Sequence, residues 1–255
     1  MNDHFHQLDA LGFAVLHGAI PGDLLSQLNE RIDQLFALEG DAAGAEFKQE
    51  PGCLRLANLV NKGDVFGRVV AYQPVLRFVS HVLPQHKLSS LNVRSVDPLG
   101  GVRQPLHADM AAIPDDRGYW VCNALWMLQD ITLENGPLRV IPGSHRAGKL
   151  PQAVLDNPID DHPDQVLVTG PAGTVVVINA HLWHGGMENR SPQARRALHA
   201  FYCRRDKPQQ QYQKGLLDAE VQSRLSPQLR ELLAIDDPQN DRLSRCVTTT
   251  SGFMK

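Results

Sequence analysis

Cysteines are few in this sequence, and none is placed to share a site with another. The four, Cys53, Cys122, Cys203 and Cys246, lie far apart and form no Cys-x-x-Cys pair. This spacing argues against a disulfide framework and against a cysteine zinc site. We therefore expect four reduced thiols, most of them buried.

Long apolar runs and blocks of one charge are also lacking. No stretch approaches the ~20 apolar residues that a membrane span needs. The start, MNDHFHQLDALGF, has no charged segment followed by an apolar core, so we expect no signal peptide and a cytoplasmic location. The net charge is −3, and the pairs Arg195-Arg196 and Arg204-Arg205 are too short for a basic patch. Neither nucleic acid nor a membrane is an expected partner, and the oligomeric state is left open.

The first third of the chain is typical of helices. Across residues 21–38, apolar residues recur at three- and four-residue spacing, namely Leu24, Leu25, Leu28, Ile32, Leu35 and Phe36. Residues 64–83 predict two short helices, the second opened by Pro74. Together these segments predict a helical layer over about residues 20–84.

The pattern changes to short strands after Pro84. Turn residues (Gly, Pro, Asn and Asp) separate the apolar segments, which is typical of a β-sandwich or barrel. A helix is expected over about residues 218–235, and we expect one mainly β domain with flanking helices across residues 1–255. The predicted strands of the β core (about 88–205) are 88–96, 119–131, 137–141, 164–168, 173–179 and 196–204.

One short motif offers a metal site. In QPLHADM, His107 and Asp109 are two residues apart, so an extended chain would point both side chains the same way. His184, which follows an apolar strand and precedes Gly185-Gly186, is the best third ligand because glycine allows close backbone approach. Two histidines and one carboxylate are typical of non-haem Fe(II) oxygenases. With 11 histidines in the chain, a loop histidine beside a solvated aspartate is the alternative.

Arg195 lies eleven residues after His184, at the start of a predicted strand. An antiparallel neighbour would carry its guanidinium back toward the metal, where its planar fork suits a carboxylate. The alternative is that Arg195 and Arg196 are two exposed charges.

Four segments together resemble the phytanoyl-CoA dioxygenase family, over roughly residues 5–205. They are PLHADM, LQDITLENGPLRVIPGSH (128–145), LWHGGMENRS, and the strand that Arg195-Arg196 opens. The stretch ENGPLRVIPGSH is the most specific of them. The resemblance implies a double-stranded β-helix, a cupin-like jelly roll, that works with Fe(II), 2-oxoglutarate and O2.

The resemblance also implies roles for particular residues. His107, Asp109 and His184 match the iron ligands, and Arg195 matches the arginine that binds the distal carboxylate of 2-oxoglutarate. Asn92 and Asn123 face the same cavity by strand parity, and Arg55 falls near a basic residue that contacts the co-substrate in some relatives. The alternative for these last three is a structural strand residue or a surface charge.

Two positions depart from the family pattern. Many relatives carry Ser or Thr two residues after the second histidine ligand, where this chain has Gly186. Many carry Trp where this chain has Leu125, and here Trp126 is next door, with its side chain expected on the opposite face. We also expect His181 at the surface or next to the metal ligands, His145 in a structural position or at the mouth of the site, and His199 simply to pack.

The implied reaction is hydroxylation of a small metabolite as 2-oxoglutarate is decarboxylated to succinate. The carboxylate of Asp109 argues against halogenation, whereas desaturation, epoxidation and ring closure stay open. Basic residues of the loops, such as Lys62 and Arg117, suggest a polar or anionic substrate. The alternatives are a metal-dependent hydrolase with the same ligands, although no HExxH signature is present, and a non-catalytic jelly-roll binding module.

Overall fold

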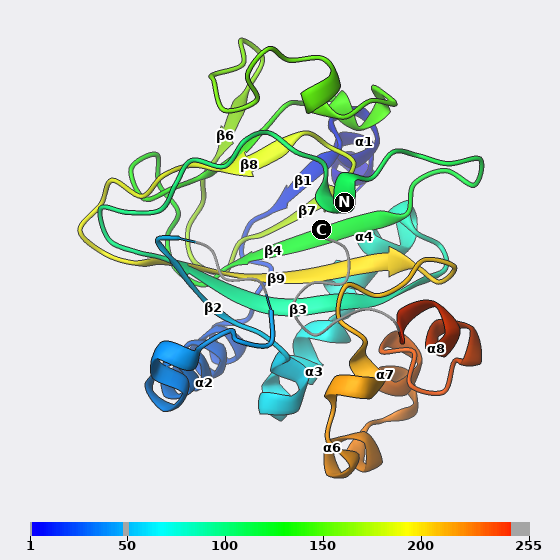
Figure 1. Ribbon diagram of the computed structural model, residues 1–255. Helices are drawn as coiled ribbons and strands as arrows, with labels where there is room; N and C mark the ends of the chain where they lie inside the picture. The colour runs from blue at the N-terminus through cyan, green and yellow to red at the C-terminus, as the bar shows by residue number, and fades with distance from the viewer. Residues whose placement is uncertain (1, 48–50, 246–255) are drawn as a thin grey trace.

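Two antiparallel sheets form the centre of the computed structural model, which describes residues 2–47 and 51–245. They lie face to face as the two layers of a jelly roll (Figure 1). The larger sheet has the strand order β1 (Phe13–Leu16), β7 (Val175–Asn179), β4 (Val121–Met127), β9 (Arg195–Arg204), β3 (His86–Val96) and β2 (Cys53–Leu56). The smaller sheet has the order β6 (Val166–Val168), β5 (Leu138–Val140) and β8 (His184–Gly186).

Each central strand of the larger sheet is buried on both faces. On β4, Leu125 and Met127 pack with Leu138 and Val140 of the smaller sheet. The alternate residue Trp126 belongs to the apolar core on the other face. Leu125 and Trp126 thus point to opposite faces of the sheet, as expected. This alternation follows from the two-residue repeat of a strand.

Helices cover the outer face of the larger sheet (Figure 1). In α2 (Gly22–Glu39), Leu24, Leu28, Ile32 and Leu35 are buried against it, as their spacing predicted. The two short helices expected over residues 64–83 are α3 (Asp64–Val70) and α4 (Gln73–Val82). The predicted helical layer is therefore confirmed.

The remaining elements are α1 (Asn2–Leu11), α5 (Gln213–Leu216), and short 3-10 turns at Gly40–Ala42, Leu59–Lys62, Asp109–Ala111, Ser144–Arg146 and Pro151–Ala153.

The single helix expected over residues 218–235 is wrong. The chain forms α6 (Ala219–Arg224) and α7 (Pro227–Leu232), followed by α8 (Pro238–Ser244). Pro227 has no N–H to donate and forces the residue before it into an extended conformation. Ser226 is extended, with φ −63° and ψ 157°, and its side chain accepts a hydrogen bond from the Leu229 N–H, so it caps the second helix.

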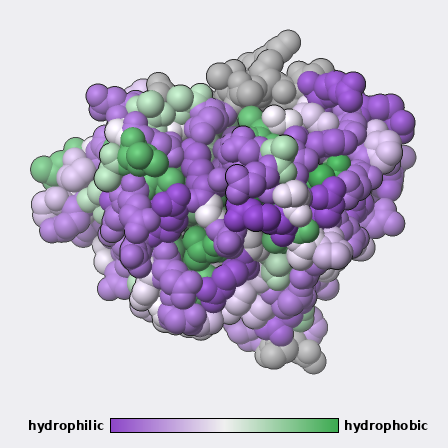
Figure 2. Space-filling view, turned by 90° about the horizontal axis from the view of Figure 1, so that it is seen from below, coloured by the Kyte–Doolittle hydropathy of each residue, from purple (hydrophilic) through white to green (hydrophobic). Residues whose placement is uncertain are grey.

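The state of the cysteines and the character of the surface agree with what the composition predicts. Cys122 and Cys203 are buried and Cys53 is half-buried, all three without a disulfide, while Cys246 lies outside the described residues. No helix in the described ranges is long and apolar enough to cross a membrane. The face that the helices present is mostly hydrophilic, with small, separate hydrophobic patches (Figure 2).

Leu28 and Leu38 test the role of α2 in the core, because Leu28 is fully buried and Leu38 is 78% exposed. We expect Leu28→Ala to lower the free energy of unfolding by about 2–5 kcal/mol, since it leaves a cavity against the sheet. Leu38→Ala should change it by less than about 0.5 kcal/mol. Urea unfolding measures both, and equal effects of the two variants would contradict this packing.

Candidate metal centre

His107, Asp109 and His184 converge on one point between the two sheets. One ligand atom from each lies within 4.8 Å of the other two. The Asp109 Oδ1 atom is 3.7 Å from Nε2 of His107 and 3.6 Å from Nε2 of His184. Two atoms that share an ion are at most about 4.2 Å apart at bonds of about 2.1 Å. Both distances to the carboxylate lie within this limit, and the three side chains are close enough together to hold a common metal ion.

The main chain holds the two histidines opposite each other. The N–H of each donates to the carbonyl of the other, with both N–O distances 2.9 Å. This isolated antiparallel bridge joins the chain before the 3-10 turn to β8. Gly185 permits the contact, because a Cβ there would lie 3.0 Å from the Gln104 carbonyl oxygen. The expectation that glycine allows close approach beside His184 is confirmed.

A sharp turn follows Asp109. Ala108 is extended, with φ −99° and ψ 139°, so His107 and Asp109 point to one side as expected. Met110 and Ala111 then both adopt positive φ, 55° and 51°. Such left-handed residues cost about 1–3 kcal/mol each and are often found at functional sites.

Backbone carbonyls orient both imidazole rings. Nδ1 of His107 lies 2.9 Å from the Pro105 carbonyl oxygen, and Nδ1 of His184 lies 2.7 Å from that of Leu182. Each Nδ1 therefore carries the proton and donates it, which leaves the Nε2 lone pair facing the shared point. Metal-binding histidines are commonly fixed in this way.

Asn123 orients the carboxylate. Its Nδ2 donates to Oδ2 of Asp109 over 3.2 Å, while Oδ1 faces the histidines. Burial alone would raise the pKa of the Asp109 carboxyl, but His184 and His107 together hold that pKa well below its usual range. Burial alone would lower the pKa of His184, but the negative charge of Asp109 raises it. The net effect is a raised pKa for His184. The carboxylate thus stays ionised beside the imidazoles.

A cavity of about 190 Å³ adjoins the centre, and we name it the arginine pocket. Its walls include Arg94, Arg195, Gln104, Gly186 and Cys53. No acidic side chain among the described residues lines it. A positively charged cavity of this size suits a small anion.

Arg195 lies in the arginine pocket and is only 5% exposed. Its guanidinium donates no hydrogen bond to any described residue, and its Nε is buried. Burial, with the nearby charge of Arg94, lowers the pKa of Arg195 to about 10. Gly186 lies on the same face of β8 as His184, and a Cβ added to it would lie 4.0 Å from Nη2 of Arg195. Arg196 instead pairs with Asp33 and stacks on Phe36, on the helical side.

Arg55 and Asn92 lie together on the inner face of the larger sheet. Nη1 of Arg55 donates to Oδ1 of Asn92 over 2.9 Å, and the guanidinium stacks on Phe47 with 4.8 Å to the ring centroid. Both residues are buried. The inward direction predicted for Asn92 is confirmed, whereas a contact of either residue with a co-substrate stays a prediction.

His199 also faces this side and was expected only to pack. It lies opposite Asn92 on β3 and Leu125 on β4. Burial and the charges of Arg94, Arg55 and Arg195 hold its pKa well below the usual value, so the imidazole is neutral. The strand parity that identified Asn92 could have identified His199 too, because it shares a face with Arg195.

His181 and His145 are buried outside the centre. Nδ1 of His181 lies 2.9 Å from Oδ1 of Asn179, and Nε2 of His145 lies 3.2 Å from the Asp9 carbonyl oxygen. Neither belongs to the three-residue metal group found among the described residues. The structural position expected for His145 is confirmed, whereas a surface position for His181 is wrong, because its side chain is only 2% exposed.

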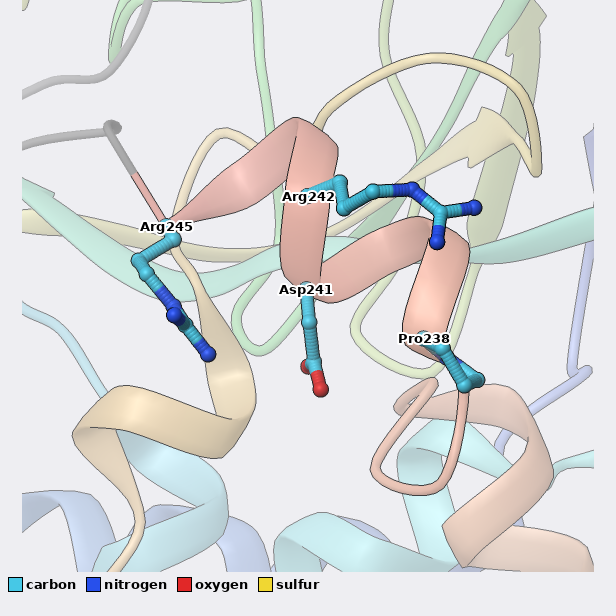
Figure 3. A pocket seen from close by; sticks show the side chains of 4 residues that line it. All are labelled: Pro238, Asp241, Arg242 and Arg245. Atoms are coloured by element: carbon cyan, nitrogen blue, oxygen red, sulfur yellow. The ribbon is translucent and has the colours of Figure 1, made fainter.

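A second hollow lies at α8 and is lined by Pro238, Asp241, Arg242 and Arg245 (Figure 3). Asp241 already accepts hydrogen bonds from Tyr212 and Lys214, at 2.7 and 2.6 Å. Its lining comes from one short helix and the residue after it, on the side of the larger sheet away from β8. These polar groups offer no convergent arrangement like that around Asp109.

Comparison with known proteins gives one consistent result. The sequence model of the phytanoyl-CoA dioxygenase family matches residues 8–197. Dioxygenase af480 of Aspergillus fumigatus is 32% identical over 140 residues, which cover 53% of this chain and 44% of that protein. Phytanoyl-CoA dioxygenase 1 of Oryza sativa subsp. japonica is 40% identical over 88 residues, covering 30% of this chain and 31% of that protein. The chain therefore spans less than half the length of these two relatives.

A solved structure supports the same fold. HygX from Streptomyces hygroscopicus, with nickel and 2-oxoglutarate bound, superposes with a TM-score of 0.68. The match covers 82% of this chain and 89% of that chain. At 19% sequence identity the likeness shows the fold alone, and it confirms the predicted jelly roll.

His181 should make the protein sensitive to acid. Burial lowers its pKa from 6.5 to about 3, so between these values the unfolded chain binds a proton that the folded chain does not. The free energy of unfolding should fall as the pH drops below about 6.5, by up to about 1.4 kcal/mol per pH unit for this group. Urea unfolding of the metal-free protein from pH 7.5 to 4 should give a shallower slope for His181→Gln. An unchanged slope would refute this assignment.

Proposed function

Because the chain belongs to the phytanoyl-CoA dioxygenase family, we propose that it is an Fe(II)- and 2-oxoglutarate-dependent dioxygenase that hydroxylates a small molecule. His107, Asp109 and His184 hold the iron, and Arg195 binds the distal carboxylate of 2-oxoglutarate. One observation carries the proposal. Two imidazoles and one carboxylate converge beside a pocket whose buried guanidinium donates no hydrogen bond to any described residue.

The donor set fits iron(II). Two neutral imidazoles and one carboxylate on one side of the ion leave the opposite positions open for a co-substrate and oxygen. A carboxylate at Asp109 also occupies the space that a halide would need, which favours oxygenation over halogenation. Asn123 fixes the orientation of that carboxylate, because its side-chain amide donates a hydrogen bond to Oδ2, the oxygen that does not face the histidines.

The arginine pocket fits the diacid. Burying the guanidinium of Arg195, which pairs with no described residue, is costly unless an anion compensates its charge, and the distal carboxylate supplies one. Arg195 is suited to grip it with two parallel hydrogen bonds. Arg55 and Asn92 are buried as one hydrogen-bonded unit on the same inner face, and we assign them to the wall that contacts the co-substrate or the substrate.

When bound, iron, 2-oxoglutarate and O2 supply the capacity to oxidise a C–H bond, with succinate and carbon dioxide as co-products. The chain positions the reactants and excludes water. Next to Asp109, Met110 and Trp120 pack against an apolar cluster that includes Phe201. A dry wall at this place protects the reacting centre from solvent.

We propose a small polar or anionic molecule as the substrate. Lys62 pairs with Glu39 and Glu46, and Arg117 pairs with Asp206. Charges paired in this way contribute little to binding an anion. The buried Arg55–Asn92 pair is the better candidate to recognise a polar group of the substrate.

Iron dependence tests the proposal against a hydrolase and a non-catalytic module. In the absence of oxygen, Fe(II) and 2-oxoglutarate together should produce a weak visible absorption band that His107→Ala lacks. With oxygen, succinate should form only when iron is present, and Asp109→Ala should abolish it because a ligand is lost. Iron-independent succinate formation by the purified protein would defeat the proposal. Screening metabolites for faster 2-oxoglutarate consumption would then identify the substrate.

Arg195 and Arg196 offer a matched pair of substitutions. Arg195→Lys should raise the KM for 2-oxoglutarate by about tenfold or more, because a single ammonium cannot replace two parallel hydrogen bonds to a carboxylate. Arg196→Lys, on the helical side, should change that KM by less than about twofold. Steady-state succinate assays measure both. Equal effects of the two variants would remove Arg195 from the co-substrate site.

A further inference from the structure

We propose that Cys53 is a site of reversible thiol–disulfide exchange with small disulfides that carry carboxylates, and that its modification closes the arginine pocket. This inference rests on the function proposed above, because it adds a means of regulation to that site. The thiol has no part in holding the metal or in the proposed reaction. Its place in the fold, the charges around it and its contrast with the other described thiols support the assignment.

The fold places Cys53 at the rim of the arginine pocket. β2 is the outermost strand of the larger sheet, and its one neighbour among the described strands is β3. Cys53 and Arg55 are two residues apart on β2, so both side chains point to the inner face. The Asp97 N–H donates to the Gly52 carbonyl over 3.0 Å, which fixes the chain just before the thiol. Cys53 is half-buried and lines the pocket, so a reagent from solvent can reach its sulfur.

The charges around the sulfur favour an anionic reagent. Arg94, Arg103 and Arg195 share the pocket wall with Cys53, and no acidic side chain among the described residues lines it. Arg195 is only 5% exposed, and its buried Nε has no hydrogen-bond partner among the described residues. Burial and the charge of Arg94 lower the pKa of Arg195, whereas a negative charge on Cys53 opposes that change. The sulfur therefore lies close enough to Arg195 for an attached carboxylate to interact with the guanidinium.

The other described thiols differ from Cys53. Cys122 and Cys203 are fully buried. Burial raises the pKa of the Cys122 thiol far above its usual value and that of Cys203 to about 11. Buried thiols of this kind are unreactive because the thiolate is the attacking form. The Cys53 thiol makes only one hydrogen bond among the described residues, to the Leu54 carbonyl over a long 3.5 Å. Cys53 is thus the described thiol that is both accessible and weakly held.

The exchange needs no reactant beyond the disulfide itself. The Cys53 thiol gives its proton to solvent, and the thiolate sulfur attacks one sulfur of the disulfide. A new S–S bond forms at Sγ as the S–S bond of the reagent breaks, and the departing half leaves as a thiolate with the electron pair. The attached half then lies in a cavity of about 190 Å³, with its carboxylate toward Arg195. It takes the place of 2-oxoglutarate until a thiol reductant removes it.

Labelling of the folded, Mn(II)-loaded protein tests the position of the reactive thiol. The reagent is dithiobis(nitrobenzoate), an aromatic disulfide with a carboxylate on each half, and the released thiolate is followed by its absorbance. We expect one fast-reacting thiol, and peptide mass spectrometry should locate the adduct at Cys53. Cys53→Ser should lose the fast phase, whereas Cys246→Ser, a matched control at a thiol outside the described residues, should keep it. A fast phase that survives in Cys53→Ser would overturn the proposal.

A neutral disulfide tests the part played by charge. The rate with dithiobis(nitrobenzoate) is divided by the rate with dithiodipyridine, and the same ratio is measured for free glutathione. We expect the ratio for Cys53 to exceed that for glutathione by about tenfold or more, because a positively charged cleft concentrates anions. Arg195→Gln and added salt should both reduce the excess. Equal ratios for Cys53 and glutathione would refute the preference for carboxylate-bearing disulfides.

The link to the co-substrate is tested by competition and by activity. With 2-oxoglutarate at about ten times its Kd, the fast phase should slow by about tenfold, because most pockets are then occupied. The labelled protein should lose succinate formation and regain it after dithiothreitol. In Cys53→Ser the reagent should leave the succinate rate of that variant within about twofold, since the other described thiols are buried.

The outcomes separate the two proposals. Absence of calorimetric binding of 2-oxoglutarate to the unlabelled, Mn(II)-loaded protein would overturn the proposed function. Binding of 2-oxoglutarate that leaves the labelling rate unchanged would overturn only the role of Cys53. Full succinate formation by protein that is completely labelled at Cys53 would do the same, since the pocket would still be open.

Discussion

Two main-chain hydrogen bonds, exchanged between His107 and His184, are the constraint on which the rest of the site depends. They join a loop to a three-residue strand and set the two imidazoles side by side, with ring centroids 4.5 Å apart. Because backbone atoms make this link, the geometry does not rely on flexible side chains or on a bound ion. A main-chain link of this kind holds both imidazoles in place, which lowers the cost of ordering the site around a ligand.

From this bridge the arrangement extends in two directions. Asp109 follows His107 on the same side of an extended segment, and the left-handed turn at Met110 and Ala111 then leads the chain away. Gly186 follows His184 on the same side of β8 and brings that strand up to Arg195. The two-residue repeat of extended chain thus places a metal ligand on one arm and the co-substrate pocket on the other.

Periodicity explains what the sequence could predict. Strand alternation placed Asn92 inward and Trp126 outward, and helical spacing placed Leu28 against the sheet. The features that were not predicted are β8, the place of Gln104 and the break before α7, and each has a different cause. The strand β8 is only three residues long and includes two glycines, so it carries no hydrophobic pattern. Gln104, which lines the arginine pocket, lies in a segment without regular structure, and the Gly186 N–H that its side chain binds is 82 residues away. The break before α7, in contrast, was visible at Pro227.

Arg139 has a consequence for anyone who would redesign this protein. Its fully buried guanidinium donates to three carbonyls, those of Asp160 and Pro158 at 2.8 Å and that of Gln104 at 2.7 Å. The loop that carries residues 158–160 is therefore fastened to the segment that leads into His107. Grafting a foreign loop at that place would release the segment as well, and lysine, whose three N–H donors share one nitrogen, lacks the planar fork with which Nη1 and Nη2 reach these carbonyls. Loop, arginine and segment should be exchanged together or not at all.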